Sequence, residues 1–222
     1  MTATKIISSE LLALGYKKHN NLYIRKVNDI ISIYSFEKPN SALYIHYAII
    51  PLFIPNPGFV YLTFGSRFNE MFSDVNINCN LVGQEEIIWT KRVINHIYQD
   101  TEPFTNEIAT SDGMERWLHR HNGFHIGDRF CIDRYFRCTS DEYISLELYY
   151  CIYKKNYSRA KKYAKKYISS IKAMKHYTEE LKSTLTKDVE NIIDLIEEEQ
   201  YEKLDELCQN RISTNMTFYS LK

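Results

Sequence analysis

Ile152-x4-Tyr157-x2-Ala160-x3-Ala164-x3-Ile168 is a stretch that the chain repeats 44 residues later, as Ile196-x4-Tyr201-x2-Leu204-x3-Cys208-x3-Ile212. In both copies the apolar residues recur every three to four positions, which is the spacing of one face of a helix. Each copy therefore predicts the end of one helix, a tight turn and the start of a second helix. Helical hairpins that repeat in this way pack on one another and usually present a surface to a partner.

The N-terminal half has the pattern of a sheet. Ser8–Gly15 predicts a short helix, with Ser8 or Ser9 at its start and Gly15 at its end. Leu22–Phe36 alternates around the polar pair Asn28-Asp29, which predicts either two strands joined by a turn or one long bent strand. Further strands are expected in Ala42–Phe53 and in Phe59–Phe64, joined by short links into an antiparallel meander. One face of this sheet should pack under helices and the other should meet solvent or a partner.

Helices are expected to dominate after Pro103, because all five prolines lie in the first 103 residues and proline is excluded from helix interiors. An earlier helix, Glu85–Tyr98, would carry an apolar stripe of Ile88, Val93, Ile94 and Ile97. The later predicted helices span Asp112–His121, Asp141–Lys155, Tyr157–His176, Asp188–Glu199 and Tyr201–Arg211.

These elements predict an α+β fold with an antiparallel sheet in the N-terminal half and a C-terminal array of helical hairpins packed on it. The sheet region with the N-terminal helix would span residues 1–103 and the helical region residues 104–222. No linker rich in Gly, Ser or Pro separates the two regions, so we expect them to form one continuous unit.

Composition narrows the class of protein. Hydrophobic residues make up 44% and charged residues 25%, as in a globular chain with a core. The 28 basic and 28 acidic residues cancel, so no overall field attracts nucleic acid or an anionic membrane. Five cysteines without a CxxC spacing favour reduced thiols, and the longest apolar stretch, Ala48–Phe53, is too short to span a bilayer. With no secretory signal at the N-terminus, we expect a cytoplasmic protein without membrane contact.

Motifs for catalysis are missing from the sequence. No Gly-x-Ser-x-Gly elbow and no Walker-type or dinucleotide glycine loop occurs, so we expect neither enzymatic activity nor a cofactor. One cluster, His119-x-His121-x3-His125 with Asp112, Glu115 and Asp128 nearby, could meet a divalent metal if the chain turned at Asn122-Gly123. His119 and His121 do not share a helix face, and Cys131 and Cys138 match no standard zinc spacing, which favours a polar loop instead.

A resemblance supports a binding role. Its residues are Gly15-Tyr16-Lys17-Lys18, Tyr23-x-Arg25, Asp29-Ile30-Ile31, Arg67, Trp89, Pro103-Phe104 and the hairpin from Tyr149 to Ile168. In their order, over roughly residues 8–170, the chain resembles an uncharacterised bacterial α+β family, some of whose members are encoded beside toxin genes. The resemblance implies an immunity role for some members of the family. Together with the missing catalytic motifs, it predicts that this chain is an immunity protein that binds and neutralises a cognate toxin. It carries over no catalytic residues.

The two hairpins differ in charge. Residues 154–175 contain nine basic residues and no acidic residue, whereas residues 179–206 contain eleven acidic residues and three lysines. Adjacent helices of opposite sign can simply pair with each other, although surface pairs add little stability. Alternatively, one of the two patches binds a partner, because an acidic inhibitor is steered toward a basic toxin that cuts nucleic acid.

We therefore select two candidate sets. The acidic set, predicted to bind the toxin, is Glu197, Glu198, Glu199, Glu202, Asp205 and Glu206. The basic set, Lys161, Lys162, Lys165 and Lys166, would instead contact phosphates in a nucleic-acid-binding regulator, the less favoured alternative.

Overall fold

The computed structural model describes residues 2–38, 42–56, 64–76, 78–79, 81–120, 124–126, 129–131, 137–175 and 177–221. The chain divides into two compact units. The first unit contains Met1–Pro51, Tyr61–Phe124 and Cys131–Arg137, and the second contains Leu52–Val60, His125–Phe130 and Cys138–Lys222. The predicted division near residue 103, with one continuous unit, stays a prediction.

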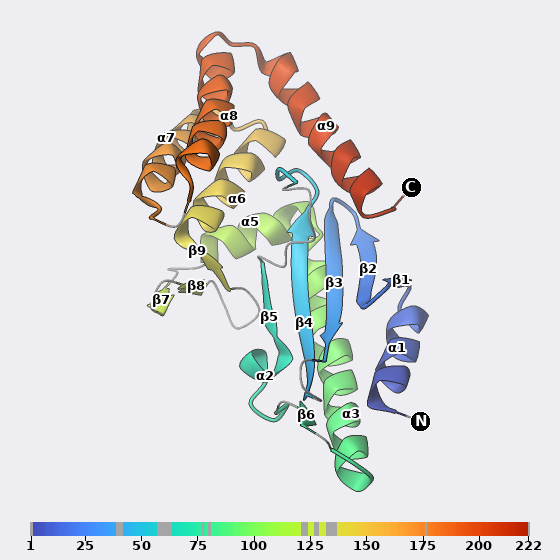
Figure 1. Ribbon diagram of the computed structural model, residues 1–222. Coiled ribbons are helices and arrows are strands. Elements are labelled where there is room, and N and C mark those ends of the chain that lie inside the picture. The colour runs from blue at the N-terminus through green and yellow to red at the C-terminus, as the bar shows by residue number, and fades with distance from the viewer. Residues whose placement is uncertain are drawn as a thin grey trace. The chain divides into compact units, whose positions relative to one another are not determined.

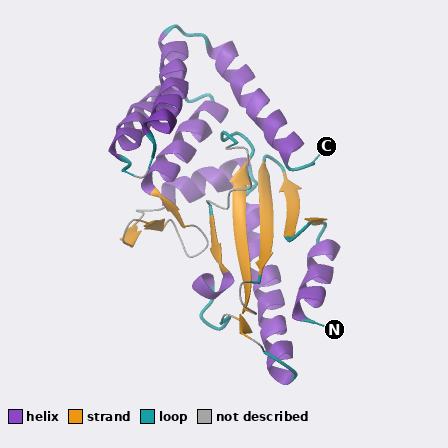
Figure 2. Ribbon diagram, viewed as in Figure 1, coloured by secondary structure: helices purple, strands orange, loops and turns teal. Residues whose placement is uncertain are grey.

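An antiparallel sheet forms the centre of the first unit (Figures 1 and 2). Its strands, in spatial order, are β1 (Lys17–His19), β2 (Leu22–Val27), β3 (Ile30–Glu37), β4 (Ala42–Pro51) and β5 (Gly65–Arg67). A short strand, β6 (Asn78–Cys79), pairs with the start of β4, and Arg137 of β9 (Arg137–Thr139) pairs with Gly65. Two further short strands are β7 (Phe124–Ile126) and β8 (Arg129–Cys131). The sheet follows chain order because Asn28, with a positive φ of 51°, closes the tight β2–β3 turn.

Helices of the first unit are α1 (Ala3–Ala13), α2 (Phe68–Met71), α3 (Gln84–His96), the π-helix η2 (Ile97–Thr101), α4 (Glu102–Ile108) and α5 (Ser111–Arg120). Side chains of η2 and α4 hydrogen-bond to one face of the sheet. For example, the hydroxyl groups of Tyr34 in β3 and Thr101 in η2 are hydrogen-bonded, with 2.6 Å between their oxygens. The central strand β3 is buried on both faces, since Ile33 and Tyr34, which point to opposite sides, are both 0% exposed. The expectation of a face open to solvent is therefore wrong at β3.

The first helix begins earlier than predicted. It starts at Ala3, after Thr2 at the N-cap, because Ala3, Ile7 and Leu11 form a buried stripe at a spacing of four. Ser8 lies inside the helix and its hydroxyl hydrogen-bonds to Tyr23, so it caps nothing. Gly15 ends the helix as predicted, with a φ of 87° that favours glycine.

The predicted helix Glu85–Tyr98 forms as α3 followed by η2. Val93 and Ile97 are buried as expected, but Ile88 is 43% exposed, and Trp89 takes its place in the core. Trp89, Val93 and Ile97 are spaced by four residues and therefore lie on the same face of the helix, whereas Ile88 lies on a different face. The apolar stripe was therefore assigned one residue out of register at its N-terminal end.

Four helices build the second unit: α6 (Ser140–Tyr153), α7 (Tyr157–Ala173), α8 (Glu179–Glu197) and α9 (Tyr201–Phe218). Consecutive helices contact each other, and α6 also contacts α9. A capping box between Thr139 and Glu142 starts α6, which is buried on most of its surface. Asn215 of α9 is 1% exposed and donates to the carbonyl oxygens of Leu52 and Ile54, at 2.7 and 2.9 Å, which fixes the segment after β4 to this unit.

The α+β class, with the antiparallel sheet first and the helical hairpins last, is confirmed. Helices α8 and α9 are both longer than predicted. Helix α8 begins earlier, directly after Thr178, whose side chain accepts a hydrogen bond from the amide of Leu181. Helix α9 extends to Phe218. The predicted strand Phe59–Phe64 lies, except for Phe64, outside the described residues.

Candidate protein-binding surface

The turns of the two helical hairpins have the same backbone geometry. Lys155 follows α6 and Glu199 follows α8, 44 residues apart, with φ of 57° and 56°. At both turns the amide of the next residue donates to the carbonyl five positions earlier, at 2.8 Å. This is the hydrogen bond of a Schellman-type helix end. The repeat seen in the sequence is therefore a repeat of structure.

Equivalent tyrosines of the two hairpins stack on each other. The rings of Tyr157 and Tyr201 are parallel to within 3°, with centroids 4.3 Å apart. Tyr157 also donates to Asp205 at 3.1 Å. Burial and that hydrogen bond raise the pKa of Tyr157 to about 12. Tyr201 is 38% exposed, so the outer ring of the stack is accessible.

Two ion pairs join the oppositely charged hairpins. Lys161 of α7 lies 2.9 Å from Glu197 of α8, and Lys155 pairs with Asp205 of α9. The hydrogen bond from Lys161 holds the pKa of Glu197 below its usual value, and the one from Lys155 does the same for Asp205. At these two places the oppositely charged hairpins therefore pair with each other, which is the first of the two alternatives drawn from the sequence.

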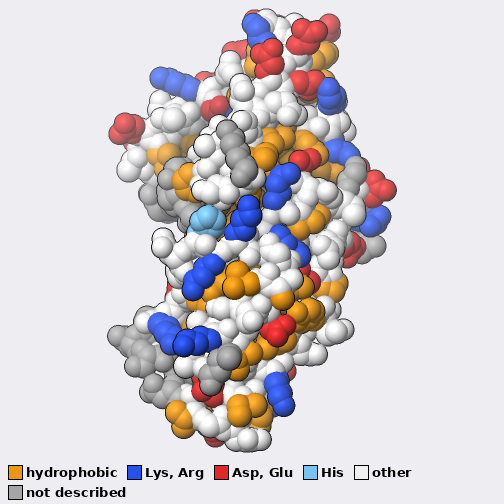
Figure 3. Space-filling model, turned by 90° about the vertical axis from the view of Figure 1, so that its right-hand side faces the viewer, with side chains coloured by type: hydrophobic (Ala, Val, Ile, Leu, Met, Phe, Trp, Pro, Cys, Tyr) orange, Lys and Arg blue, Asp and Glu red, His pale blue; other side chains and the backbone are white. Residues whose placement is uncertain are grey.

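The acidic set divides into two parts. Glu197 pairs with Lys161 of α7 and Asp205 with Lys155 of the α6–α7 turn, whereas Glu198, Glu199, Glu202 and Glu206 are exposed and pair with no cation among the described residues. These four, which we call the acidic tip, surround the α8–α9 turn and the first two turns of α9. Figure 3 shows acidic side chains, with basic ones among them, at its upper end, the height of the α8–α9 turn in Figure 1.

The basic set also divides. Lys161 is partly buried against Glu197, whereas Lys162, Lys165 and Lys166 are exposed on α7. The ammonium of Lys166 lies 5.3 Å from the ring centroid of Tyr163, and Tyr167 is buried. Because Tyr167 is in the core, the two tyrosines do not form an accessible stacking platform for bases.

Partly buried ion pairs connect the helices beneath this surface. Asp188 of α8 accepts from Tyr149 of α6 at 2.9 Å and from Arg211 of α9 at 3.0 Å. Glu147, which is 2% exposed, pairs with Arg159 at 3.2 Å. Burial raises the pKa of Tyr149 well above its usual value, so its phenol stays protonated and donates. Together, these contacts connect α6, α7, α8 and α9.

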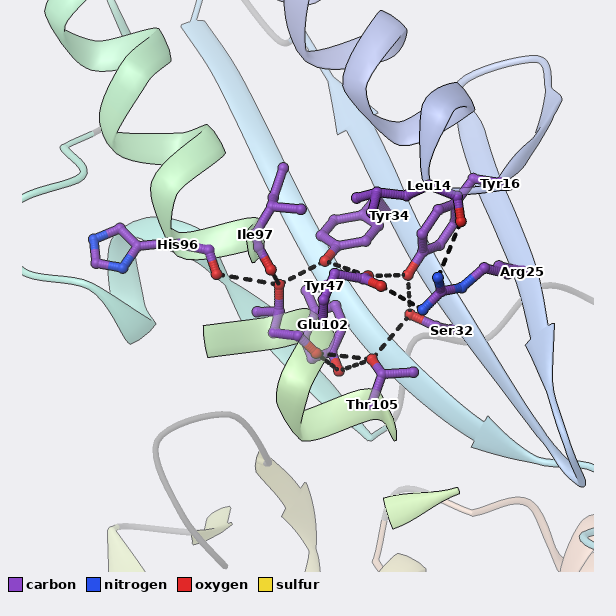
Figure 4. A network of polar contacts seen from close by, with 11 residues as sticks. Leu14, Tyr16, Arg25, Ser32, Tyr34, Tyr47, His96, Ile97, Glu102 and Thr105 are labelled. Carbon is purple, nitrogen blue, oxygen red and sulfur yellow. Dashed lines mark hydrogen bonds and ion pairs between the residues drawn. The ribbon is translucent and has the colours of Figure 1, made fainter. Parts of the chain in front are cut away.

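A second polar cluster lies inside the first unit and was not predicted. Glu102, the first residue of α4, is 5% exposed and forms an ion pair with Arg25 of β2 (Figure 4). Tyr16 donates to the same carboxylate at 2.5 Å, and Tyr34 donates at 3.3 Å. Arg25 also donates to the carbonyl of Leu14 at 3.0 Å. A buried charge is thus compensated by a cation and two phenols.

Hydroxyl groups extend the cluster along the sheet. Tyr47 hydrogen-bonds to Thr105 at 2.7 Å and to the carbonyl of Thr101 at 3.2 Å, and Tyr16 bonds to Ser32 at 2.7 Å. Burial, followed by the charge of Glu102, raises the pKa of Tyr16 far above its usual value. Its phenol is therefore a hydrogen-bond donor at neutral pH and no nucleophile. The cluster joins β2, β3 and β4 to η2 and α4.

The signal for this cluster was weak in the sequence. Arg25 and Tyr16 stand out in the sequence only as residues of the resemblance, and no pattern in the sequence singles out Glu102. The partners lie 77 residues apart, and spacing within one element cannot reveal such a pair. A charged residue directly before Pro103, at the start of a helix, reads as an ordinary first-turn carboxylate.

Most of the histidine cluster lies outside the residues that the structure describes. His121 and Asp128 lie outside the described residues, and the side chains of His119 and His125 do too. Among the residues whose side chains the structure describes, no group of three His, Cys, Asp or Glu side chains is placed to hold a metal ion. Whether His119, His121 and His125 bind a metal stays an open prediction.

Within the described part of the chain, none of the helices combines the length and apolarity needed to cross a membrane. Comparison of the chain with protein-family models, with curated proteins and with solved structures found no match.

Proposed function

We propose that this chain is a non-catalytic protein-binding module, an immunity protein that neutralises a cognate bacterial toxin. The observation that carries the proposal is the acidic tip, with four exposed carboxylates that lack a cation among the described residues. A field of one sign speeds association with a partner of the opposite sign and rejects partners of the same sign. The family resemblance adds the expectation of a toxin.

The rest of the second unit supports this role. The acidic tip sits on helices held by the partly buried pairs of Asp188 and Glu147, so its carboxylates are presented from a fixed frame. The exposed ring of Tyr201 lies next to Glu202 and offers contact area with little loss of side-chain entropy. Cys138, Cys151 and Cys208 are buried thiols, which agrees with a role in the reducing cytoplasm.

The first experiment is affinity capture of the tagged chain from its native cells, followed by mass spectrometry. A stoichiometric protein partner with a basic surface supports the proposal. Nucleic acid alone would favour the alternative regulator that uses the exposed Lys162, Lys165 and Lys166, and a chain without any partner would contradict both functions.

Charge reversal then locates the surface. Replacing Glu198, Glu199 and Glu202 by Lys should slow association with the captured partner and flatten its salt dependence. A matched control replaces Glu85, Glu180 and Glu190, which are exposed carboxylates outside the acidic tip, by Lys. Both variants change the net charge equally. If both variants slow association equally, the effect comes from the net charge of the chain, and the acidic tip is not the interface.

A further inference from the structure

His96 lies between two carboxylates of the first unit. Its Nδ1 is 2.8 Å from Asp100 in η2, and its Nε2 is 2.8 Å from Asp74 in the turn that follows α2. The ring of Phe72 stacks on the imidazole, with centroids 3.9 Å apart and an angle of 12°. The His96 side chain is 16% exposed, so protons of the solvent reach it.

The two contacts require different chemistry from a neutral ring and from a charged ring. A carboxylate only accepts hydrogen bonds, and a neutral imidazole has one N–H donor and one bare nitrogen. Both 2.8 Å contacts are therefore favourable only in the imidazolium form, which donates from both nitrogens. On loss of one proton, a nitrogen lone pair faces a carboxylate oxygen, and one of the contacts must open.

Asp74 is the contact that opens. The side chain of Asp74 is 48% exposed and can turn to water, whereas that of Asp100 is 19% exposed and sits one turn along the same helical stretch. Near His96 the charged groups are Asp74 from the turn, Asp100 from η2, and Arg92 on α3, which donates to the Asp74 carbonyl at 3.0 Å. Slight burial raises the pKa of Asp74, and the hydrogen bond and charge of His96 lower it by more, so that the pKa lies below its usual value.

The contacts of His96 also connect to the buried cluster around Glu102 in this unit. Thr101 of η2 donates to the carbonyls of His96 and Ile97, at 3.4 and 3.3 Å, and Glu102 follows Thr101 directly. Short π-helical turns often mark functional positions, because they hold a helix in a less common register. His96 thus ties the surface turn to the segment that positions Glu102.

We propose that His96 is a pH-sensitive brace, which in its imidazolium form ties the turn at residues 72–76 to η2 and on deprotonation releases Asp74. Trp89 and Arg92 still hold this turn, at 2.7 Å to Asn76 and 3.0 Å to Asp74, so the turn loosens without detaching. The brace is independent of the proposed binding function.

The test follows the ring and the turn together in the full chain. Nitrogen-15 spectra recorded over a pH series report the charge of the His96 ring, because its two nitrogens are both protonated only in the charged form. Hydrogen exchange reports the Val75 amide, which donates to Phe72 at 3.1 Å. We expect the protection factor of Val75 to fall about tenfold as the ring loses its proton, since one charge-assisted hydrogen bond is lost.

Asp74→Asn separates the brace from general effects of pH. Its amide can accept from a ring N–H or donate to a bare nitrogen, so protection of Val75 should become independent of pH. Asp194→Asn, at an exposed position of α8, should behave as the unmodified chain. Constant protection during ring deprotonation, a ring that holds two protons throughout, or an unchanged pH dependence in Asp74→Asn would each overturn the proposal.

Discussion

The ion pair between Arg25 and Glu102 offers the sharpest test of how the first unit is held together. The Glu102 side chain is 7% exposed and that of Arg25 is 18% exposed. Arg25→Met removes the only cation that contacts this carboxylate among the described residues and leaves a buried charge. Removing one partner of a buried pair typically costs about 3–5 kcal/mol, and we expect a loss of that size in the free energy of unfolding.

The reverse substitution should cost less. In Glu102→Met, Arg25 keeps its bond to the carbonyl of Leu14 and can reach water, while Tyr16 keeps Ser32 and Tyr34 keeps Thr101 as partners. We expect a loss of about 1–3 kcal/mol for this variant. The double variant leaves no unpaired charge, so its loss should also be about 1–3 kcal/mol. The two single effects are then not additive, and the coupling energy is about 3–5 kcal/mol, the size of the loss in Arg25→Met.

Tryptophan fluorescence during urea unfolding measures this cycle in the correct part of the chain. Both tryptophans, Trp89 and Trp117, are buried in the first unit, so their signal does not report the helical array. Equal slopes with denaturant across the four proteins would show that the comparison is valid. A double variant whose loss equals the sum of the single losses would refute the reasoning, because the two charges would then act independently.

Three further predictions concern the second unit. Glu199→Gly should raise the free energy of unfolding by about 0.5–1 kcal/mol, because glycine adopts the positive φ without strain, whereas Glu199→Ala should give no gain in the same denaturation assay. Asn215→Ala should lower it by about 2–4 kcal/mol, since two buried carbonyls lose their donor, while the exposed Thr214→Ala should change it by less than about 0.5 kcal/mol. Burial raises the pKa of Tyr149, so the unfolded chain loses this proton first above about pH 10, and stability falls as pH rises. Tyr149→Phe should reduce that fall by about 1.4 kcal/mol per pH unit, measured by circular dichroism, and an unchanged slope would contradict the assignment.

Sequence reasoning succeeded where the cause of structure is local. The copies at Tyr157 and Tyr201 share apolar spacing, helix ends and turns, and each of these depends on residues within one or two turns of helix. The strands around Asn28 were found for the same reason. Helix starts were less accurate, since burial of Ala3 and Ile7 against the rest of the first unit extends α1 beyond what capping residues indicate.

Contacts between distant segments were out of reach. The cluster around Glu102 depends on which strand lies under α4, and alternation of apolar residues does not specify that partner. The charge partition of the hairpins was visible in the sequence, but not which carboxylates face a lysine. Only the helix packing distinguishes Glu197, which meets Lys161, from Glu198, its neighbour in the chain.

This division of the acidic set bears on how a basic partner would bind. The pairs of Lys161 with Glu197 and of Lys155 with Asp205 are largely exposed, and such pairs are weak because water and salt screen them. A partner's cation can therefore replace either lysine at little cost in free energy. Lys161→Gln should then strengthen binding of a basic protein, because Glu197 joins the acidic tip, while the pairs of Asp188 with Arg211 and of Glu147 with Arg159 keep the helical array folded. Weaker binding of that variant would show instead that α7 itself contacts the partner.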